Sequence, residues 1–171
     1  MSHPAQIRFV ASVREKFAHL FDGQSVLEVG SLNINGSIRQ FFTNCNYIGI
    51  DLGPGPGVDL IARGEELAYP DGSFDVVASC ECFEHNPMWL ETFKNMVRMS
   101  RHLVFFSCAT TGRPEHGTPR TSHCDAPYCG EYYRNLTHED FLSQCDMSEF
   151  SAWEFSVDNS AHDLYFWGIK R

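Results

Sequence analysis

The sequence has few basic residues and no long apolar run. Its 171 residues include 13 Lys and Arg against 22 Asp and Glu, so the formal net charge is -9. The basic residues are spread along the chain and form no stripe that would neutralise a nucleic-acid backbone. An acidic surface is also repelled by an anionic membrane, and no apolar run approaches the roughly 20 residues that cross a bilayer. We therefore expect neither a nucleic-acid partner nor a membrane partner.

The N-terminal residues also lack the basic and apolar regions of a signal peptide, which favours a cytoplasmic protein. The seven cysteines are an odd number, and Cys80, Cys82 and Cys108 lie in apolar runs, where free thiols behave as small apolar side chains. We expect the cysteines to be mostly reduced. There is no internal repeat, and the length predicts a single domain with a real hydrophobic core.

The spacing of apolar residues predicts an α/β fold. Steps of three and four residues predict helices over 4–20 and 88–99, and Thr137 with Asp140 predicts the start of a helix over 138–145. Short apolar runs separated by Gly, Pro, Asn and Asp predict strands. These runs cover residues 25–29, 47–51, 58–62, 74–79 and 103–106, with two aromatic-rich runs near 151–157 and 164–169. Continuous hydrophobicity in the first and fourth runs indicates strands buried on both faces, as in parallel sheets covered by helices.

Two predicted strands end in residues suited to a nucleoside ligand. The first strand runs into a turn with Gly30, where the backbone can approach a ligand closely, and Gly36 with Ser37 can open the next helix. The second strand ends at Asp51, whose carboxylate can accept both hydroxyls of a ribose. Ligands of open α/β sheets bind at this edge of the strands. A plain strand-to-helix turn and an Asp that only starts a turn remain the alternatives.

The same turn argues against a dinucleotide cofactor. A dinucleotide site would also have an acidic residue at about the position of Asp51, so Asp51 alone does not decide between the two ligands. A dinucleotide site requires, however, the pattern Gly-x-Gly-x-x-Gly, which is missing here. Glu28 at the entry to the turn would repel a pyrophosphate, whereas it suits a cationic group. A nucleotide-cofactor oxidoreductase is therefore the less favoured alternative.

Four segments, in order along the chain, carry a family resemblance. They are Val26-Leu27-Glu28-Val29-Gly30, Tyr47-Ile48-Gly49-Ile50-Asp51, Tyr69-Pro70-Asp71-Gly72-Ser73-Phe74-Asp75-Val76-Val77 and Glu84-His85. Together they resemble the class I S-adenosylmethionine-dependent methyltransferases, in particular the small methyltransferase-domain proteins. The resemblance implies a single-domain Rossmann-like fold with a seven-stranded, mostly parallel sheet, the last strand antiparallel, and helices on both faces.

The resemblance also implies which residues bind the cofactor, S-adenosyl-L-methionine. Glu28 and Gly30 would line its methionine part, with Asn35 and Gly36 shaping the turn. Asp51 would bind the ribose and Leu52 would lie against adenine, while Ser79 and Cys80 would border the sulfonium. Where the family often has an Asp that accepts the adenine amino group, this chain has Arg63, so the contact falls to Glu65 or to backbone.

On this interpretation residues 1–22 are an N-terminal helix, 25–107 the cofactor-binding half, 108–136 an acceptor loop, and 137–171 a C-terminal helix and strands. The loop follows the fifth strand at the cofactor's edge of the sheet, and irregular loops in that position commonly carry function. Its candidate acceptor-binding residues are cations and aromatic side chains. These are Arg113, Arg120, Tyr132, Tyr133 and Arg134. The arginines would suit a carboxylate or phosphate on the acceptor, and the alternative is that the Tyr-Tyr-Arg run only anchors the loop.

The predicted reaction is in-line displacement of a methyl group by a small-molecule or glycan acceptor. If a proton must leave, His85 is the first candidate for a general base and His116 the second, although either can equally be structural. His116, His123, Cys124 and Cys129 have loose spacing for zinc, so we expect no metal. A non-catalytic cofactor-binding or protein-interaction module is the alternative function.

Overall fold

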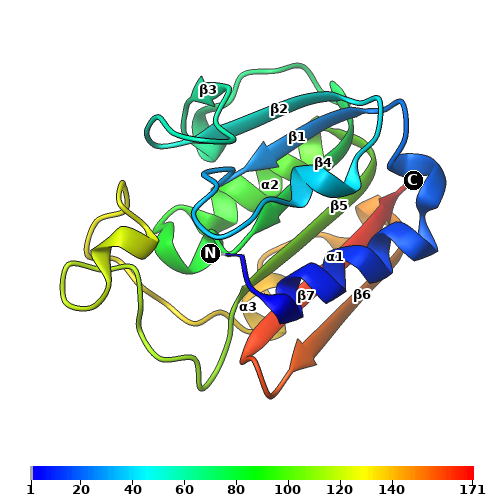
Figure 1. The fold of residues 1–171 in the computed structure, drawn as a ribbon. Coiled ribbons are helices and arrows are strands. Elements are labelled where there is room, and N and C mark those ends of the chain that lie inside the picture. The colour runs from blue at the N-terminus through cyan, green and yellow to red at the C-terminus, as the bar shows by residue number, and fades with distance from the viewer. Residues whose placement is uncertain (1) are drawn as a thin grey trace.

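The computed structural model describes residues 2–171, which form one mixed seven-stranded sheet with helices on both faces (Figure 1). The strand order is β3-β2-β1-β4-β5-β7-β6. The first five strands pair in parallel, whereas β7 is antiparallel to both β5 and β6. The strands are β1 (Ser25–Val29), β2 (Asn46–Asp51), β3 (Leu60–Ile61), β4 (Phe74–Cys80), β5 (Ser100–Ala109), β6 (Phe150–Asp158) and β7 (Asp163–Lys170). The predicted fold class is confirmed.

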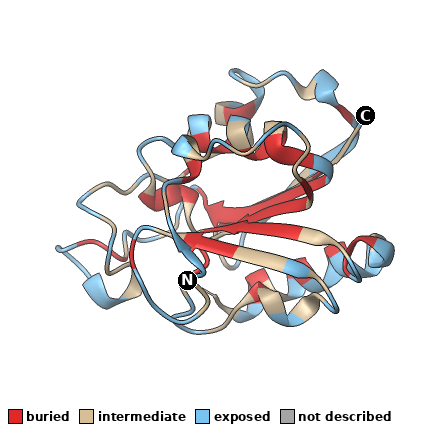
Figure 2. Cartoon of the chain, turned by 90° about the horizontal axis from the view of Figure 1, so that it is seen from above, coloured by how far each residue is buried: buried red, intermediate tan, exposed pale blue. Residues whose placement is uncertain are grey.

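Three α-helices cover the sheet: α1 (Pro4–Lys16), α2 (Trp89–Met99) and α3 (His138–Leu142). The α1 helix lies on one face and buries Phe9, Val10 and Val13, while α2 and α3 lie on the other. Adjacent strand residues alternate between the two cores; for example, Phe105 faces the α1 side and Phe106 the α2 side. The central strands are therefore buried from both sides, as Figure 2 shows, and this explains their continuous hydrophobicity.

Several predicted boundaries differ from the structure. The first helix ends at Lys16 and continues only as the 3-10 turn η1 (Ala18–Leu20). The third strand is reduced to Leu60–Ile61 at the exposed edge of the sheet. The predicted capping box is present, since Thr137 and Asp140 cap the start of α3 reciprocally. No helix among residues 2–171 is both long and apolar enough to cross a membrane.

The helix expected after the first strand does not form. The Ser37 hydroxyl accepts a hydrogen bond from the Arg39 amide, as a helix cap would, but only the 3-10 turn η2 (Ile38–Phe41) follows. The turn before it is held by other contacts: the Asn33 side chain accepts a hydrogen bond from the Gly36 amide, and the Asn33 amide donates to the Pro56 carbonyl. After the turn the chain leaves the helical conformation at Phe42, whose backbone is extended, so no full helix follows.

Candidate cofactor and acceptor site

The strand register brings three strand ends to one level. Val29 pairs with Ile50 of β2 and with Ser79 of β4, so that Gly30, Asp51 and Cys80 follow side by side. All three border a cavity of about 290 Å³ at the carboxyl edge of the sheet. This is the edge at which open α/β sheets bind ligands.

Asp51 is held by the backbone around it. One carboxylate oxygen accepts the Leu32 amide at 2.9 Å and the other accepts the Leu52 amide at 2.7 Å. Burial raises the pKa of this carboxyl, and these two hydrogen bonds oppose that shift. Since each carboxylate oxygen has two lone pairs, one on each oxygen is left to accept a ribose hydroxyl.

Glu28 supplies a second carboxylate beneath the turn. It is only 4% exposed, and it accepts a hydrogen bond of 2.7 Å from the Tyr47 hydroxyl. Burial raises the pKa of Glu28 to about 7. A cationic ligand in the cavity would favour the ionised form of this carboxyl.

The cavity fits the cofactor that the sequence implies. Its lining holds several carboxylates against one guanidinium, that of Arg63, which suits a ligand bearing a sulfonium and an ammonium and disfavours a pyrophosphate. The buried hydroxyl of Ser31 in the same lining has no hydrogen-bond partner among residues 2–171, as a group that awaits a ligand or a water would.

Arg63 lies close to Glu65 in this lining. Its guanidinium is 3.7 Å from the Glu65 carboxylate, whose second oxygen accepts a hydrogen bond from the Thr92 hydroxyl at 3.0 Å. Glu65 thus has fixed partners on both oxygens, and it remains the candidate acceptor for the adenine amino group.

Most of the predicted cofactor residues border the cavity, together with two of the other candidates. They are Glu28, Gly30, Gly36, Asp51, Leu52, Glu65, Cys80, His85 and Tyr132. Asn35 is exposed outside the lining, and Ser79 is fully buried with its hydroxyl donating to the Val29 carbonyl. Ser79 therefore holds β4 to β1 and does not face the cavity.

The three loop arginines are each paired with carboxylates of the same chain. Arg113 contacts Asp163 at 2.8 Å, Arg120 contacts Glu115 at 2.8 Å, and Arg134 contacts Asp140 at 2.5 Å. None of them borders the cavity, and neither does Tyr133. Their predicted role in acceptor binding remains a prediction, and their observed contacts are those of residues that fix the loop.

The part of the loop that does border the cavity is residues 125–132. Tyr128 closes over it: its hydroxyl donates to the Pro54 carbonyl at 2.7 Å, and its ring lies directly against Gly53. Tyr132 is the one predicted site residue in this segment, whereas Tyr128, Ser31 and Ser2 were not among the predicted site residues. The aromatic content of the loop was the only sequence signal for Tyr128.

His85 borders the cavity, whereas His116 lies behind it. Their rings are perpendicular, with centroids 5.0 Å apart. Burial lowers the pKa of His85 to about 3, and burial also lowers the pKa of His116. Both imidazoles are therefore neutral at physiological pH, and His85 is a weak base.

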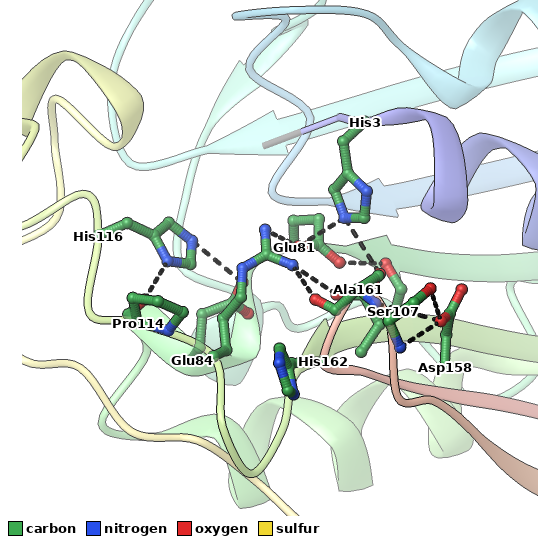
Figure 3. A network of polar contacts seen from close by, with 12 residues as sticks. His3, Glu81, Glu84, Ser107, Pro114, His116, Asp158, Ala161 and His162 are labelled. Carbon is green, nitrogen blue, oxygen red and sulfur yellow. Dashed lines mark hydrogen bonds and ion pairs between the residues drawn. The ribbon is translucent and has the colours of Figure 1, made fainter.

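A second polar cluster links the N-terminal helix to the sheet beside the cavity (Figure 3). His3, which caps α1, lies 3.1 Å from the Asp163 carboxylate and 3.4 Å from that of Glu81. Arg113 completes the cluster, so two cations face two buried carboxylates. Hydrogen bonds to Asp163 and Glu81 raise the pKa of His3 to about 9.

Replacing His3 should destabilise the protein in a pH-dependent way. Because the pKa of His3 rises from 6.5 to about 9 on folding, its stabilisation is complete below pH 6.5 and is lost as pH rises through 9. We expect His3→Gln to lower the free energy of unfolding by about 2 kcal/mol at pH 6 and by little at pH 10. Urea denaturation at both pH values measures this difference. The control is His102→Gln, at an exposed histidine. Equal effects of the two variants at pH 6 would contradict a stabilising role for the contacts of His3 with Asp163 and Glu81.

Comparison with known proteins agrees with this geometry. Residues 27–106 match the family model for a methyltransferase domain. No curated protein sequence matches the chain significantly.

Solved structures with the same fold share little sequence with this chain. The 1,6-didemethyltoxoflavin-N1-methyltransferase of Burkholderia thailandensis, solved with that compound and S-adenosylhomocysteine, is 18% identical, with a TM-score of 0.62 over 97% of this chain and 78% of its own. The YcgJ protein of Bacillus subtilis is 13% identical, with a TM-score of 0.63 over 99% of both chains. The CurJ carbon methyltransferase is 12% identical, with a TM-score of 0.66 over 96% of this chain and 54% of its own.

The strand order, the strand-end residues and the family match agree with one another. Residues 27–106, which match the methyltransferase-domain model, include the strand ends Gly30, Asp51 and Cys80 that border the cavity, so the sequence match and the fold point to the same site.

Proposed function

We propose that this methyltransferase acts on a hydroxyl or amino group of a small molecule, sugars included, bound beneath residues 125–132. One observation carries the proposal: a single cavity runs from Asp51, at the ribose end, to His85 and Tyr132 under the loop. Such continuity suits a reaction in which cofactor and acceptor must lie in line. The Burkholderia structure, which contains a small heterocycle beside the cofactor product, supports an acceptor of this size.

The charge of the lining favours a neutral or cationic acceptor. Asp125 borders the cavity near the loop, Glu81 and Glu131 also border it but are paired with cations, and the arginines of the loop are already paired. An acceptor with a carboxylate or phosphate would meet like charges and would find no unpaired guanidinium there. The loop arginines, which would suit a carboxylate or phosphate if they were unpaired, therefore do not argue for an anionic acceptor.

The proposed mechanism depends on positioning more than on proton transfer. When bound, the cofactor would supply a methyl group on a sulfonium: an acceptor lone pair would bond to the methyl carbon as the carbon–sulfur bond breaks, S-adenosylhomocysteine would leave, and any proton on the acceptor would be lost to solvent after the transfer. Asp51 fixes the ribose, Glu28 faces the cationic end, and Tyr128 holds the loop so that water is excluded. The neutral His85 imidazole makes a hydrogen bond to the acceptor and orients it; with its pKa lowered to about 3, it is too weak a base to take a full proton.

The test is an assay for S-adenosylhomocysteine with panels of neutral sugars, amines and carboxylic acids. We expect turnover with a neutral or amino acceptor, little with the acids, and a larger loss of activity in His85→Asn than in the control His102→Asn. Cofactor binding without turnover on any neutral or amino acceptor would contradict the proposed acceptor class. Turnover confined to the acids would contradict the charge argument.

A further inference from the structure

A buried carboxylate and two imidazoles face one another where the loop meets the end of β4. Glu84 and His85 lie in the 3-10 turn η4 (Phe83–His85), and His116 approaches from the loop. One ligand atom from each lies within 4.8 Å of the other two, and the His116 Nε2 atom is 3.9 Å from a Glu84 oxygen (Figure 3).

The polar atoms of this cluster lack partners. The Glu84 side chain is fully buried, and neither of its oxygens accepts a hydrogen bond from another residue within 2–171. His85 Nδ1 and His116 Nε2 are also buried without a hydrogen-bond partner in that range. Burying one such group is costly, and burying four together at one point calls for a bound group that satisfies them.

The second polar cluster shows how buried carboxylates are paired with cations in the same protein. Glu81 and Asp163 are also buried, but His3 and Arg113 neutralise them, and the Ser107 hydroxyl donates to Glu81 at 2.8 Å. At Glu84, by contrast, the only basic side chain within ion-pair distance among residues 2–171 is the His116 imidazole, at 3.9 Å.

The surroundings orient the His116 ring for a ligand. His116 Nδ1 lies 3.1 Å from the Pro114 carbonyl, which can only accept a hydrogen bond, so Nδ1 carries the proton. The lone pair of Nε2 then points toward Glu84. A metal-binding histidine is commonly held in this way by its second nitrogen. Gly117 lets the loop backbone lie against His85, since a Cβ atom there would be 2.7 Å from the ring.

We propose that Glu84, His85 and His116 bind a divalent transition-metal cation, with zinc as the ion that best suits two imidazoles and one carboxylate. Such three-residue sets leave a coordination position open for a ligand. Ligands about 2.1 Å from zinc lie roughly 3.4 Å apart in a tetrahedral site, so the observed spacing must contract by about an ångström. The spacing of the loop cysteines predicted that they bind no metal. That prediction does not apply to this cluster, because no cysteine takes part in it.

The open position would face the cavity, because His85 borders it. The cation would there hold an oxygen or nitrogen of the acceptor, a role that rests on the proposed function. Metal binding itself does not depend on that function. It can therefore be tested without cofactor or acceptor.

The experiment is calorimetric titration of ZnCl₂ into the purified, EDTA-treated full chain. We expect one zinc per chain with micromolar or tighter affinity, weakened at least about 100-fold in Glu84→Gln and in His116→Ala. His123→Ala, at an exposed histidine of the same loop, is the matched control and should bind as the wild type does. Thermal melting in EDTA checks that each variant folds.

Three results would overturn the proposal: no zinc binding by the wild type, unchanged binding in the two ligand variants, or loss of binding in His123→Ala. If Glu84→Gln fails to fold, His116→Ala carries the test, because its side chain lies on a partly exposed loop. Substituted Co²⁺ gives a second readout, since its visible spectrum reports tetrahedral coordination. Failure of the proposed function would instead appear as absent turnover in the acceptor assay.

Discussion

Replacing Asp51 with Ala should weaken binding of S-adenosylmethionine and S-adenosylhomocysteine by about 100-fold or more. Hydrogen bonds to a charged group contribute about 1.5–3 kcal/mol each, and the substitution removes two of them to the ribose. A loss of about 3 kcal/mol corresponds to roughly a 100-fold change in Kd. Calorimetric titration with both ligands measures the effect.

Two variants separate the ribose contact from damage to the turn. Asp51→Asn keeps an oxygen for one of the two backbone amides that Asp51 accepts, so it should lose less affinity than Ala. Asp59 also accepts a hydrogen bond from a backbone amide, that of Gly49, but it does not border the cavity. Asp59→Asn should therefore leave the Kd unchanged. Equal affinity of Asp51→Ala and the wild type would place the ribose elsewhere.

The strand ends could be predicted from the sequence because the evidence for them, an apolar run and the residue type at its end, is local. Continuous apolar runs marked the buried central strands, and a Gly or an Asp directly followed them. In parallel strands these ends meet at one edge, so Gly30, Asp51 and Cys80 could be grouped before the structure was known. The capping box of α3 was equally local, since both of its members lie within four residues.

The contacts of the loop could not be predicted because they depend on how a long segment closes. Arg113 pairs with Asp163, 50 residues away, and no spacing rule links them. An unpaired arginine on a loop suggests an anionic ligand, whereas the structure shows it neutralised by its own chain. The same closure brings His116 to within 3.9 Å of Glu84, a proximity that no spacing in the sequence indicates.

The Glu84-His85 pair was visible in the sequence as part of a family motif, but its burial was not. A carboxylate beside a histidine at a strand end is ordinarily read as exposed and solvated. The sequence signal for this burial is Gly117 in the irregular loop, because its lack of a side chain allows the loop to lie against His85.

Gly30→Ala should be the most damaging single change in the turn. Gly30 has a φ of +80°, and a Cβ atom there would lie 2.7 Å from Cys82 Cβ and 2.8 Å from its Sγ. The left-handed conformation costs roughly 1–2 kcal/mol for a residue with a Cβ, and overpacking costs about 1–3 kcal/mol more. We expect the free energy of unfolding to fall by about 3 kcal/mol in urea denaturation. Cofactor binding should be lost as well, because the displaced turn carries Ser31 and the Leu32 amide.

Gly72 offers a matched control that separates the cost of the left-handed backbone conformation from the cost of overpacking. Its φ is +64°, but nothing lies within 4 Å of a Cβ built there, so Gly72→Ala should lose only the conformational part, about 1 kcal/mol. The double variant Gly30→Ala/Cys82→Gly removes the overlap and should recover part of the loss relative to Cys82→Gly alone. If Gly30→Ala were no less stable than Gly72→Ala, close packing against Cys82 would not be what requires glycine.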